Sequence, residues 1–192
     1  VDYLTSETIW SIDRLPNRFL IIGGGGMGCE LAQAFQNFGS SVVQIESADR
    51  LLSREDEEVS LIIQDKFKEI GIDVLAGHRL LKFKKHGKQK SAVTQRLSDG
   101  IILNIAFDQV LYATGQSPNA ENFGLEELGV EMSQSGGIEV NDHLQTNFPN
   151  IFAVGDVVGQ FQHTNVASYQ GFYAAINSIF GGIWKLAVDY SV

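Results

Sequence analysis

The sequence predicts an α/β fold built on a parallel sheet, and three observations support this prediction. An apolar run, 19–22, leads directly into a glycine-rich segment and a helical pattern. A β-branched run at 41–45 and a shorter apolar run at 72–75 each follow a helical pattern. We expect 18–22, 41–45 and 72–75 to be neighbouring parallel strands, with helices on both faces of the sheet.

The glycine-rich segment fits the pattern G-x-G-x-x-G at Gly23, Gly25 and Gly28. In a strand–helix turn the first glycine permits a sharp turn, and the second lets a pyrophosphate approach the backbone. The third lets the helix pack closely on the strand. The N-terminus of that helix also offers free N–H groups and a positive dipole end. The segment is therefore a candidate dinucleotide-binding loop.

An acidic residue, Glu46, ends the second predicted strand, about 20 residues beyond the glycines. A carboxylate at this position accepts a hydrogen bond from the free ribose 2′-hydroxyl of NAD, whereas a 2′-phosphate would face a like charge. The first charged residue after it is Asp49, and Arg50 is the nearest cation that could meet a phosphate. We therefore expect NADH to be preferred over NADPH.

The other elements of this half follow in order. Ser6 is expected to cap a short helix at about 7–13, which Pro16 separates from the first strand. The glycine helix should end near Phe38, and the acids at 55–58 should open a second helix. The apolar faces expected for the two helices are Leu31, Ala34, Phe35 and Phe38, and then Val59, Ile62, Ile63, Phe67 and Ile70. Together with the strands, these helices make a βαβαβ unit, which is half of a Rossmann fold.

The chain then changes character. Short segments at 79–85, 91–97 and 101–107, separated by turn signals, predict an antiparallel three-stranded meander with a solvated basic hairpin. A strand at 108–113 should rejoin the parallel sheet. Farther on, the sequence predicts a helical turn at 125–129, short strands at 138–140 and 151–154, and a long helix over 163–180 that two glycines end.

Composition excludes several classes of function. The net charge of −9 over 192 residues disfavours nucleic acid or an anionic membrane as a partner. No apolar run is as long as a membrane span, and the four histidines lack metal-ligand spacing, so we expect no metal. The single cysteine, Cys29, cannot form an internal disulfide and is expected to be a buried packing residue. Sparse cysteine favours a reducing, cytoplasmic location.

Four stretches of the chain, taken together and in their order along the sequence, match the motifs of one protein family. They are Leu15-Pro16 before Ile21-Ile22-Gly23-Gly24-Gly25, then Gly28-Cys29-Glu30-Leu31-Ala32, then Tyr112-Ala113-Thr114-Gly115-Gln116-Ser117-Pro118-Asn119, then Thr146-Asn147-Phe148-Pro149-Asn150-Ile151-Phe152-Ala153-Val154-Gly155-Asp156. In these stretches the sequence resembles the FAD- and NAD(P)-dependent pyridine nucleotide-disulfide oxidoreductases, which include dihydrolipoamide dehydrogenase, glutathione reductase and mercuric reductase.

The resemblance implies a role for each matching site. The three glycines of the loop would hold the NAD(P)H pyrophosphate. Glu30 would lie near the contact between nicotinamide and flavin, although a first-turn Glu that only suits the helix dipole is an equal alternative. Ala113, Thr114 and Gly115 would form the turn where the chain leaves the NAD domain. Gly155 and Asp156 would form the turn whose carboxylate hydrogen-bonds the ribityl chain of FAD.

The resemblance also implies a domain organisation. It consists of a lead-in segment (1–18), an NAD(P)-binding Rossmann-like domain (19–118) and the C-terminal part of an FAD-binding domain (119–192). The family's Cys-x4-Cys redox pair and its catalytic His and Glu find no match here. We therefore expect an internal piece of a homodimeric enzyme, without catalytic residues and inactive alone. In the intact enzyme a hydride passes from NADH to FAD. The alternative is a non-catalytic nucleotide-binding or redox-sensing module, against which the Gly155-Asp156 stretch argues.

Overall fold

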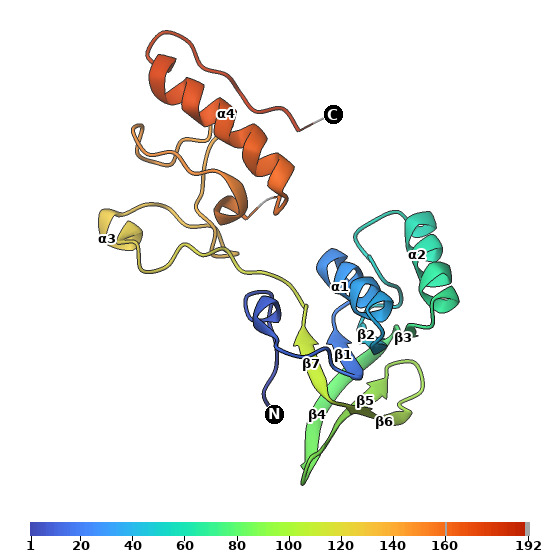
Figure 1. The fold of residues 1–192 in the computed structure, drawn as a ribbon. Coiled ribbons are helices and arrows are strands. Elements are labelled where there is room, and N and C mark those ends of the chain that lie inside the picture. The colour runs from blue at the N-terminus through green and yellow to red at the C-terminus, as the bar shows by residue number, and fades with distance from the viewer. Residues whose placement is uncertain (160, 191–192) are drawn as a thin grey trace. The chain divides into compact units, whose positions relative to one another are not determined.

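The computed structural model describes residues 1–159 and 161–190. The chain divides into two compact units, the first running from Val1 to Gly115 and the second beginning at Gln116 (Figure 1). The first unit holds both sheets, and the second holds short helices, loops and one long helix.

A four-stranded parallel sheet forms the centre of the first unit. Its strands are β1 (Arg18–Ile22), β2 (Ser41–Ile45), β3 (Asp73–Leu75) and β7 (Gln109–Tyr112), in the order β3-β2-β1-β7. All three strand pairs are parallel. The predicted neighbouring strands are therefore confirmed, as is the return of the chain to this sheet near residue 109.

The two faces of the sheet are covered differently. Phe19 and Ile21 of β1 pack in one apolar cluster with residues of α1 (Gly26–Asn37) and α2 (Glu57–Glu69). Leu20 and Ile22, which alternate with them, pack in a second cluster with residues of the antiparallel sheet. The prediction of helices on both faces was therefore wrong. The connection from β3 to β7 is a meander rather than a helix, and the meander covers the second face.

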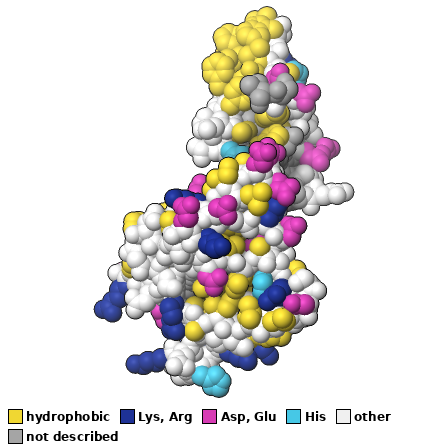
Figure 2. Space-filling model, turned by 90° about the vertical axis from the view of Figure 1, so that its right-hand side faces the viewer, with side chains coloured by type: hydrophobic (Ala, Val, Ile, Leu, Met, Phe, Trp, Pro, Cys, Tyr) yellow, Lys and Arg dark blue, Asp and Glu magenta, His cyan; other side chains and the backbone are white. Residues whose placement is uncertain are grey.

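The meander consists of β4 (His78–His86), β5 (Gln89–Arg96) and β6 (Ile102–Phe107), paired antiparallel in that order, as predicted. Lysines of the β4–β5 hairpin are mostly exposed, and basic side chains are visible at this end of the first unit (Figure 2). Because β4 lies at an edge of its sheet, these charges also disfavour pairing with another strand.

The buried faces of the two helices differ in part from the prediction. In α1, Leu31 and Phe35 are buried, but Phe38 is 69% exposed because it lies at the C-cap, beyond the last helical residue. In α2, Phe67 is buried, whereas Ile62 is 66% exposed and Val59 is also exposed. The inward face instead includes Ser60, whose hydroxyl donates a hydrogen bond to the Leu51 carbonyl. A polar residue on the buried face therefore shifted the apparent apolar stripe.

The lead-in segment is less helical than expected. It forms only a 3₁₀ turn, η1 (Ile9–Ser11), preceded by Thr8, so the predicted cap by Ser6 was wrong. The Thr8 hydroxyl instead accepts a hydrogen bond from the Thr5 N–H at 2.8 Å. Leu4 pairs with the outer side of β7, accepting a hydrogen bond from the Tyr112 N–H at 2.9 Å. The segment thereby extends the parallel sheet by one residue pair.

The second unit contains α3 (Leu125–Leu128), η2 (Gly155–Val158) and α4 (Thr164–Phe180), which ends at Gly181. Both helical predictions are confirmed. The strands expected at 138–140 and 151–154 were wrong: within the described residues they reduce to single bridges, Met132 with Ile138 and Gln145 with Phe152. Within residues 1–159 and 161–190, no helix combines the length and hydropathy of a bilayer span.

Candidate dinucleotide-binding site

The glycines of the loop between β1 and α1 have three different surroundings. Gly23 has φ +117°, and a Cβ there would collide with the Ala113 carbonyl oxygen of β7's continuation. A Cβ on Gly28 would collide with the Gly23 carbonyl oxygen. A Cβ on Gly25 would meet no atom within 4 Å. The fold itself therefore requires glycine at 23 and 28, whereas Gly25 leaves open space beside the backbone.

Gly24 is a further constrained position that the sequence analysis did not single out. A Cβ on it would lie 2.7 Å from Leu51 Cδ2 and 2.8 Å from Glu46 Cγ. Its carbonyl accepts a hydrogen bond from the Leu52 N–H at 2.8 Å. The segment after β2 therefore folds back over the loop. No pattern in the sequence shows this contact, because it joins residues far apart in the chain.

Glu46 lies directly against the loop. Its Oε2 accepts a hydrogen bond from the Gly24 N–H, and its Oε1 accepts from the Ala48 N–H at 2.7 Å and the Ser47 hydroxyl at 3.0 Å. The half-buried carboxylate is therefore fixed at the end of β2 with its negative charge beside Gly24. An incoming ribose that reaches this loop meets an acceptor, and a phosphate there meets a like charge.

Arg50 is held away from such a role by its own hydrogen bonds. Its guanidinium donates to the carbonyl oxygens of Ser53 at 3.1 Å and Glu55 at 3.0 Å. Turning this side chain towards a phosphate beside Glu46 would break these bonds. The cation that the sequence offered as the best partner for a 2′-phosphate is thus already engaged in stabilising its own loop.

The start of α1 faces the open side of the loop. In the described part of the chain no side chain caps this helix, so its first-turn N–H groups lack the usual side-chain acceptor. The dipole makes this end favourable for an anion. Glu30 is exposed and follows the first turn of α1, which holds no acidic residue. Together, Gly25 and the uncapped helix end have the room and the donors that a pyrophosphate requires.

Cys29 faces inward from the same turn, as predicted. It is 7% exposed, and its thiol donates to the Gly24 carbonyl oxygen, with the two atoms 3.5 Å apart. Burial raises the pKa of the Cys29 thiol to about 11. The thiol is therefore protonated at neutral pH and serves in packing.

Residues 113–115 adjoin the glycine loop on its other side. Ala113 is buried, and its N–H donates to the Ile22 carbonyl oxygen at 2.8 Å. Thr114 and Gly115 are exposed, and Gly115 has φ +138°. The structure therefore brings Ala113 against Gly23, two positions that are 90 residues apart, and leaves Thr114 open to solvent.

Gly155 and Asp156 open η2 in the second unit. Gly155 has φ +77°, and its N–H donates to Gln170 Oε1 of α4 at 2.6 Å. The Asp156 carboxylate is exposed to solvent. Gln170 is 1% exposed and its Nε2 donates to the Tyr190 hydroxyl at 2.7 Å, so both ends of its amide are paired. The turn is therefore rigidly supported beneath an accessible acid.

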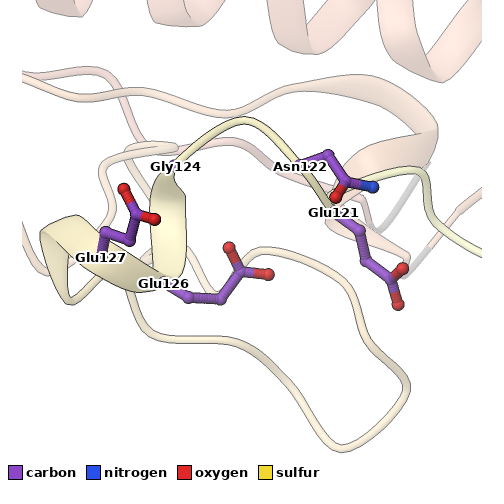
Figure 3. A pocket seen from close by; sticks show the side chains of 5 residues that line it. All are labelled: Glu121, Asn122, Gly124, Glu126 and Glu127. Atoms are coloured by element: carbon purple, nitrogen blue, oxygen red, sulfur yellow. The ribbon is translucent and has the colours of Figure 1, made fainter.

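A hollow with a volume of about 640 Å³ lies elsewhere in the second unit (Figure 3). It is lined by Glu121, Asn122, Gly124, Glu126 and Glu127, none of which is a predicted site residue. Among the residues that the structure describes, no three His, Cys, Asp or Glu side chains are grouped to hold a metal ion. This acidic hollow is open surface, and its like charges do not suit a dinucleotide.

Comparisons with known proteins show the family to which the chain is similar. Residues 1–171 match the family model described as "Pyridine nucleotide-disulphide oxidoreductase". Dihydrolipoyl dehydrogenase of Corynebacterium glutamicum is 35% identical over 175 residues, which cover 91% of this chain and 37% of that protein. Mercuric reductase of Staphylococcus aureus is 35% identical over 189 residues, which cover 98% of this chain and 34% of that protein.

Solved structures show the same likeness. The HOCl-induced flavoprotein disulfide reductase RclA from Escherichia coli matches with a TM-score of 0.84 and 27% sequence identity, over 96% of this chain and 41% of that one. LpdA from Mycobacterium tuberculosis matches with a TM-score of 0.82 and 25% identity, over 97% of this chain and 39% of that one. The chain therefore spans between about a third and two fifths of the length of these relatives.

Proposed function

The chain belongs to the pyridine nucleotide-disulphide oxidoreductase family, and from this premise we propose that it is the NAD(P)H-binding portion of an FAD-dependent oxidoreductase. Residues 19–118 are the proposed nucleotide-binding domain, 1–18 lead into it, and 119–192 are the C-terminal part of the FAD-binding domain. The observation that carries the proposal is the pairing of the open position at Gly25 with the uncapped N-terminus of α1.

In this proposal the pyrophosphate lies along Gly23, Gly25 and Gly28, beside the first-turn N–H groups of α1. Glu30 stands near the nicotinamide–flavin contact. Residues 113–115 form the turn next to the glycine loop. When both cofactors are bound to the intact enzyme, the nicotinamide supplies a hydride and the flavin accepts it. The protein's own residues bind and orient, and none of those described here acts as a catalytic residue.

The proposed nucleotide is NADH rather than NADPH. Glu46 is fixed beside Gly24 as an acceptor for a ribose hydroxyl, and its charge opposes a 2′-phosphate. Arg50, the nearest cation in the sequence, is bonded to the carbonyls of Ser53 and Glu55. A like-charge contact of this kind costs several kcal/mol when it is buried, and less at this half-exposed position.

The second unit is the proposed ribityl-binding end of the FAD domain, with Asp156 as the acceptor for ribityl hydroxyls. Its carboxylate is exposed, and the N–H of the preceding Gly155 donates to Gln170, which supports the turn that carries Asp156. The intact enzyme is proposed to be a cytoplasmic homodimer. It transfers electrons onward from FAD, and the final acceptor is determined by segments that this chain does not contain.

Calorimetric titration of the chain with NADH and NADPH at moderate salt tests the proposal. We expect NADH to bind at least about tenfold more tightly, a difference of about 1.4 kcal/mol. Glu46→Ala should narrow this ratio by weakening NADH and relieving the repulsion of NADPH. Absence of binding by either nucleotide would contradict the nucleotide-binding role. Equal or tighter binding of NADPH would contradict only the choice of cofactor.

A further inference from the structure

A fully buried amide lies beneath the glycine loop. Gln44 is 0% exposed in β2, on the face that packs against α1, where its neighbours along the strand are apolar. Its Nε2 donates to the Gly23 carbonyl oxygen at 2.9 Å and to Cys29 Sγ at 3.7 Å. The side chain of Gln44 therefore reaches from the core to the backbone of the loop.

Gln44 and Glu46 both form hydrogen bonds with the same peptide group. The peptide bond between Gly23 and Gly24 presents its carbonyl oxygen to Gln44 Nε2 and its N–H to Glu46 Oε2. The Gly23 N–H, on the preceding peptide group, donates to the Ile45 carbonyl oxygen at 2.8 Å. Three consecutive residues at the end of β2 thus fix the chain where it leaves β1. Because glycine has little conformational preference of its own, the orientation of this peptide depends on these partners.

The packing of the core does not itself call for an amide at this position. Within the described residues, Gln44 Oε1 has no hydrogen-bond partner although it is buried. A buried acceptor left unpaired destabilises the folded state, and an apolar side chain of similar size would avoid that cost. What the amide provides is its bond to the Gly23 carbonyl oxygen.

We propose that Gln44 is a positioning residue that orients the Gly23–Gly24 peptide so that the following loop is preorganised for a pyrophosphate. Gln44 acts through Gly23 and does not touch the nucleotide, and the inference rests on the proposed nucleotide-binding role of this loop. A preordered loop binds more tightly because less conformational freedom is lost on binding. Loss of the amide should therefore weaken binding more than it weakens the fold.

The variant Gln44→Met tests this. It removes the unpaired Oε1 but leaves the Gly23 carbonyl unpaired in its place, so we expect little change in the midpoint of urea unfolding. We expect the NADH dissociation constant to rise at least about fivefold, by analogy with the coupling energies of positioning contacts. With Glu46→Ala as the second change, the two effects on NADH affinity should be less than additive, because both side chains hold one peptide group.

Gln36→Met is the matched control. Gln36 also bridges two backbone groups, accepting from the Val42 N–H at 3.1 Å and donating to the Ile70 carbonyl oxygen at 2.9 Å. These contacts lie at the opposite end of β2 from the glycine loop. Here both backbone groups lose their partner, so the midpoint of unfolding should fall while the NADH dissociation constant stays within about twofold of the wild type.

A readout without nucleotide separates this inference from the proposed function. Amide hydrogen exchange of Gly24, followed by NMR, should be at least about fivefold faster in Gln44→Met than in the wild type and unchanged in Gln36→Met. If the wild-type chain binds no NADH, the proposed function fails and the exchange measurement still decides whether Gln44 orients the loop. Wild-type exchange at Gly24 together with wild-type NADH affinity in Gln44→Met would overturn the inference.

Gln44→Glu provides a second variant in case Gln44→Met does not fold. A carboxyl group at this buried site can donate to the Gly23 carbonyl oxygen only when it is protonated. The ratio of its NADH dissociation constant to that of the wild type should therefore fall as the pH is lowered. The neighbouring titratable groups, Cys29, Glu30 and Glu46, are present in both proteins and largely cancel in this ratio. A ratio that is independent of pH would count against the hydrogen bond.

Discussion

Cys29 lies in the first turn of α1, beside the loop that would hold a dinucleotide, yet its surroundings keep it protonated. Burial is the main cause of the raised pKa of about 11, and the nearby charges of Glu46 and Glu30 act in the same direction. The hydrogen bond from Gln44 acts in the opposite direction. Because the thiolate is the reactive form of cysteine, this thiol should be a poor nucleophile at neutral pH.

This environment predicts a pH dependence of stability. The pKa of Cys29 is raised from 9.0 to about 11 on folding, so the unfolded state loses the thiol proton first as the pH rises. The contribution of the buried thiol is fully present below about pH 9 and is lost as the pH rises towards 11. The difference in unfolding free energy between wild type and Cys29→Ala, measured in urea across this range, should shrink accordingly. A difference that stays constant from pH 8 to 11 would contradict the assignment.

At the scale of residues, the sequence allowed the prediction of residues whose type and spacing indicate a ligand. Glu46 was predicted at the end of the second strand as an acceptor for a ribose hydroxyl; the structure places it directly after β2, with its carboxylate against the Gly24 N–H. Gly24 and Gln44 were not predicted. Their importance comes from contacts with residues about 20 positions away, and a buried amide in a β-branched run has no signature in sequence.

At the scale of elements, we predict that alanine substitutions at three glycines of the turn from β1 into α1 have different effects on stability and on NADH binding. Gly28→Ala should lower stability by about 1–3 kcal/mol, because the added Cβ collides with the Gly23 carbonyl oxygen. Gly25→Ala should leave stability nearly unchanged but weaken NADH, since it fills open space beside the backbone. A Cβ on Gly26 meets no atom and its backbone is helical, so Gly26→Ala should raise stability by about 0.4–1 kcal/mol by restricting the unfolded chain.

Chemical denaturation and NADH titration of the three variants check this pattern. Gly26→Ala is the control, because its effect on NADH should be smaller than that of Gly25→Ala. If Gly25→Ala bound NADH as tightly as the wild type, the pyrophosphate would not lie along this position. If Gly28→Ala were as stable as the wild type, the close approach of α1 to the loop would not be required.

The elements differ in how well local sequence determined them. Strands β1 and β2 and helix α1 were predicted to within about two residues because strand propensity, glycine spacing and helix periodicity agree. The prediction of the buried face of α2 was wrong in part, because Ser60 lies on that face whereas Val59 and Ile62 face solvent. Segments 138–140 and 151–154 have strand-like composition, but each pairs at a single bridge, and the composition of one segment does not reveal how far its pairing extends.

At the scale of the whole molecule, the two units differ in how completely they bury their apolar residues. The first unit contains two clusters that enclose the parallel sheet from both faces. The described core cluster of the second unit contains only Ala120, Val130, Ile138 and Ala153 as buried members. Apolar side chains on and after α4 remain exposed, among them Phe172 at 62%, Ile179 at 73% and Ile183 at 84% (Figure 2). This imbalance supports the proposal that the second unit is one part of a larger domain.

Because the proposed function assigns NADH binding to this chain, we predict that the chain alone binds the nucleotide but does not catalyse NADH-dependent disulfide reduction. An NADH-dependent disulfide reductase needs a bound flavin and a pair of thiols. Of the proposed FAD site, this chain supplies only the turn at Gly155 and Asp156, and its one cysteine is buried with a pKa of about 11. The purified chain should therefore be colourless, should bind NADH in a calorimeter, and should show no NADH oxidation with a disulfide such as lipoamide or oxidised glutathione. Adding FAD should not change this result. A preparation that is yellow with stoichiometric FAD, or that oxidises NADH in proportion to added disulfide, would show that the residues present form a complete redox site.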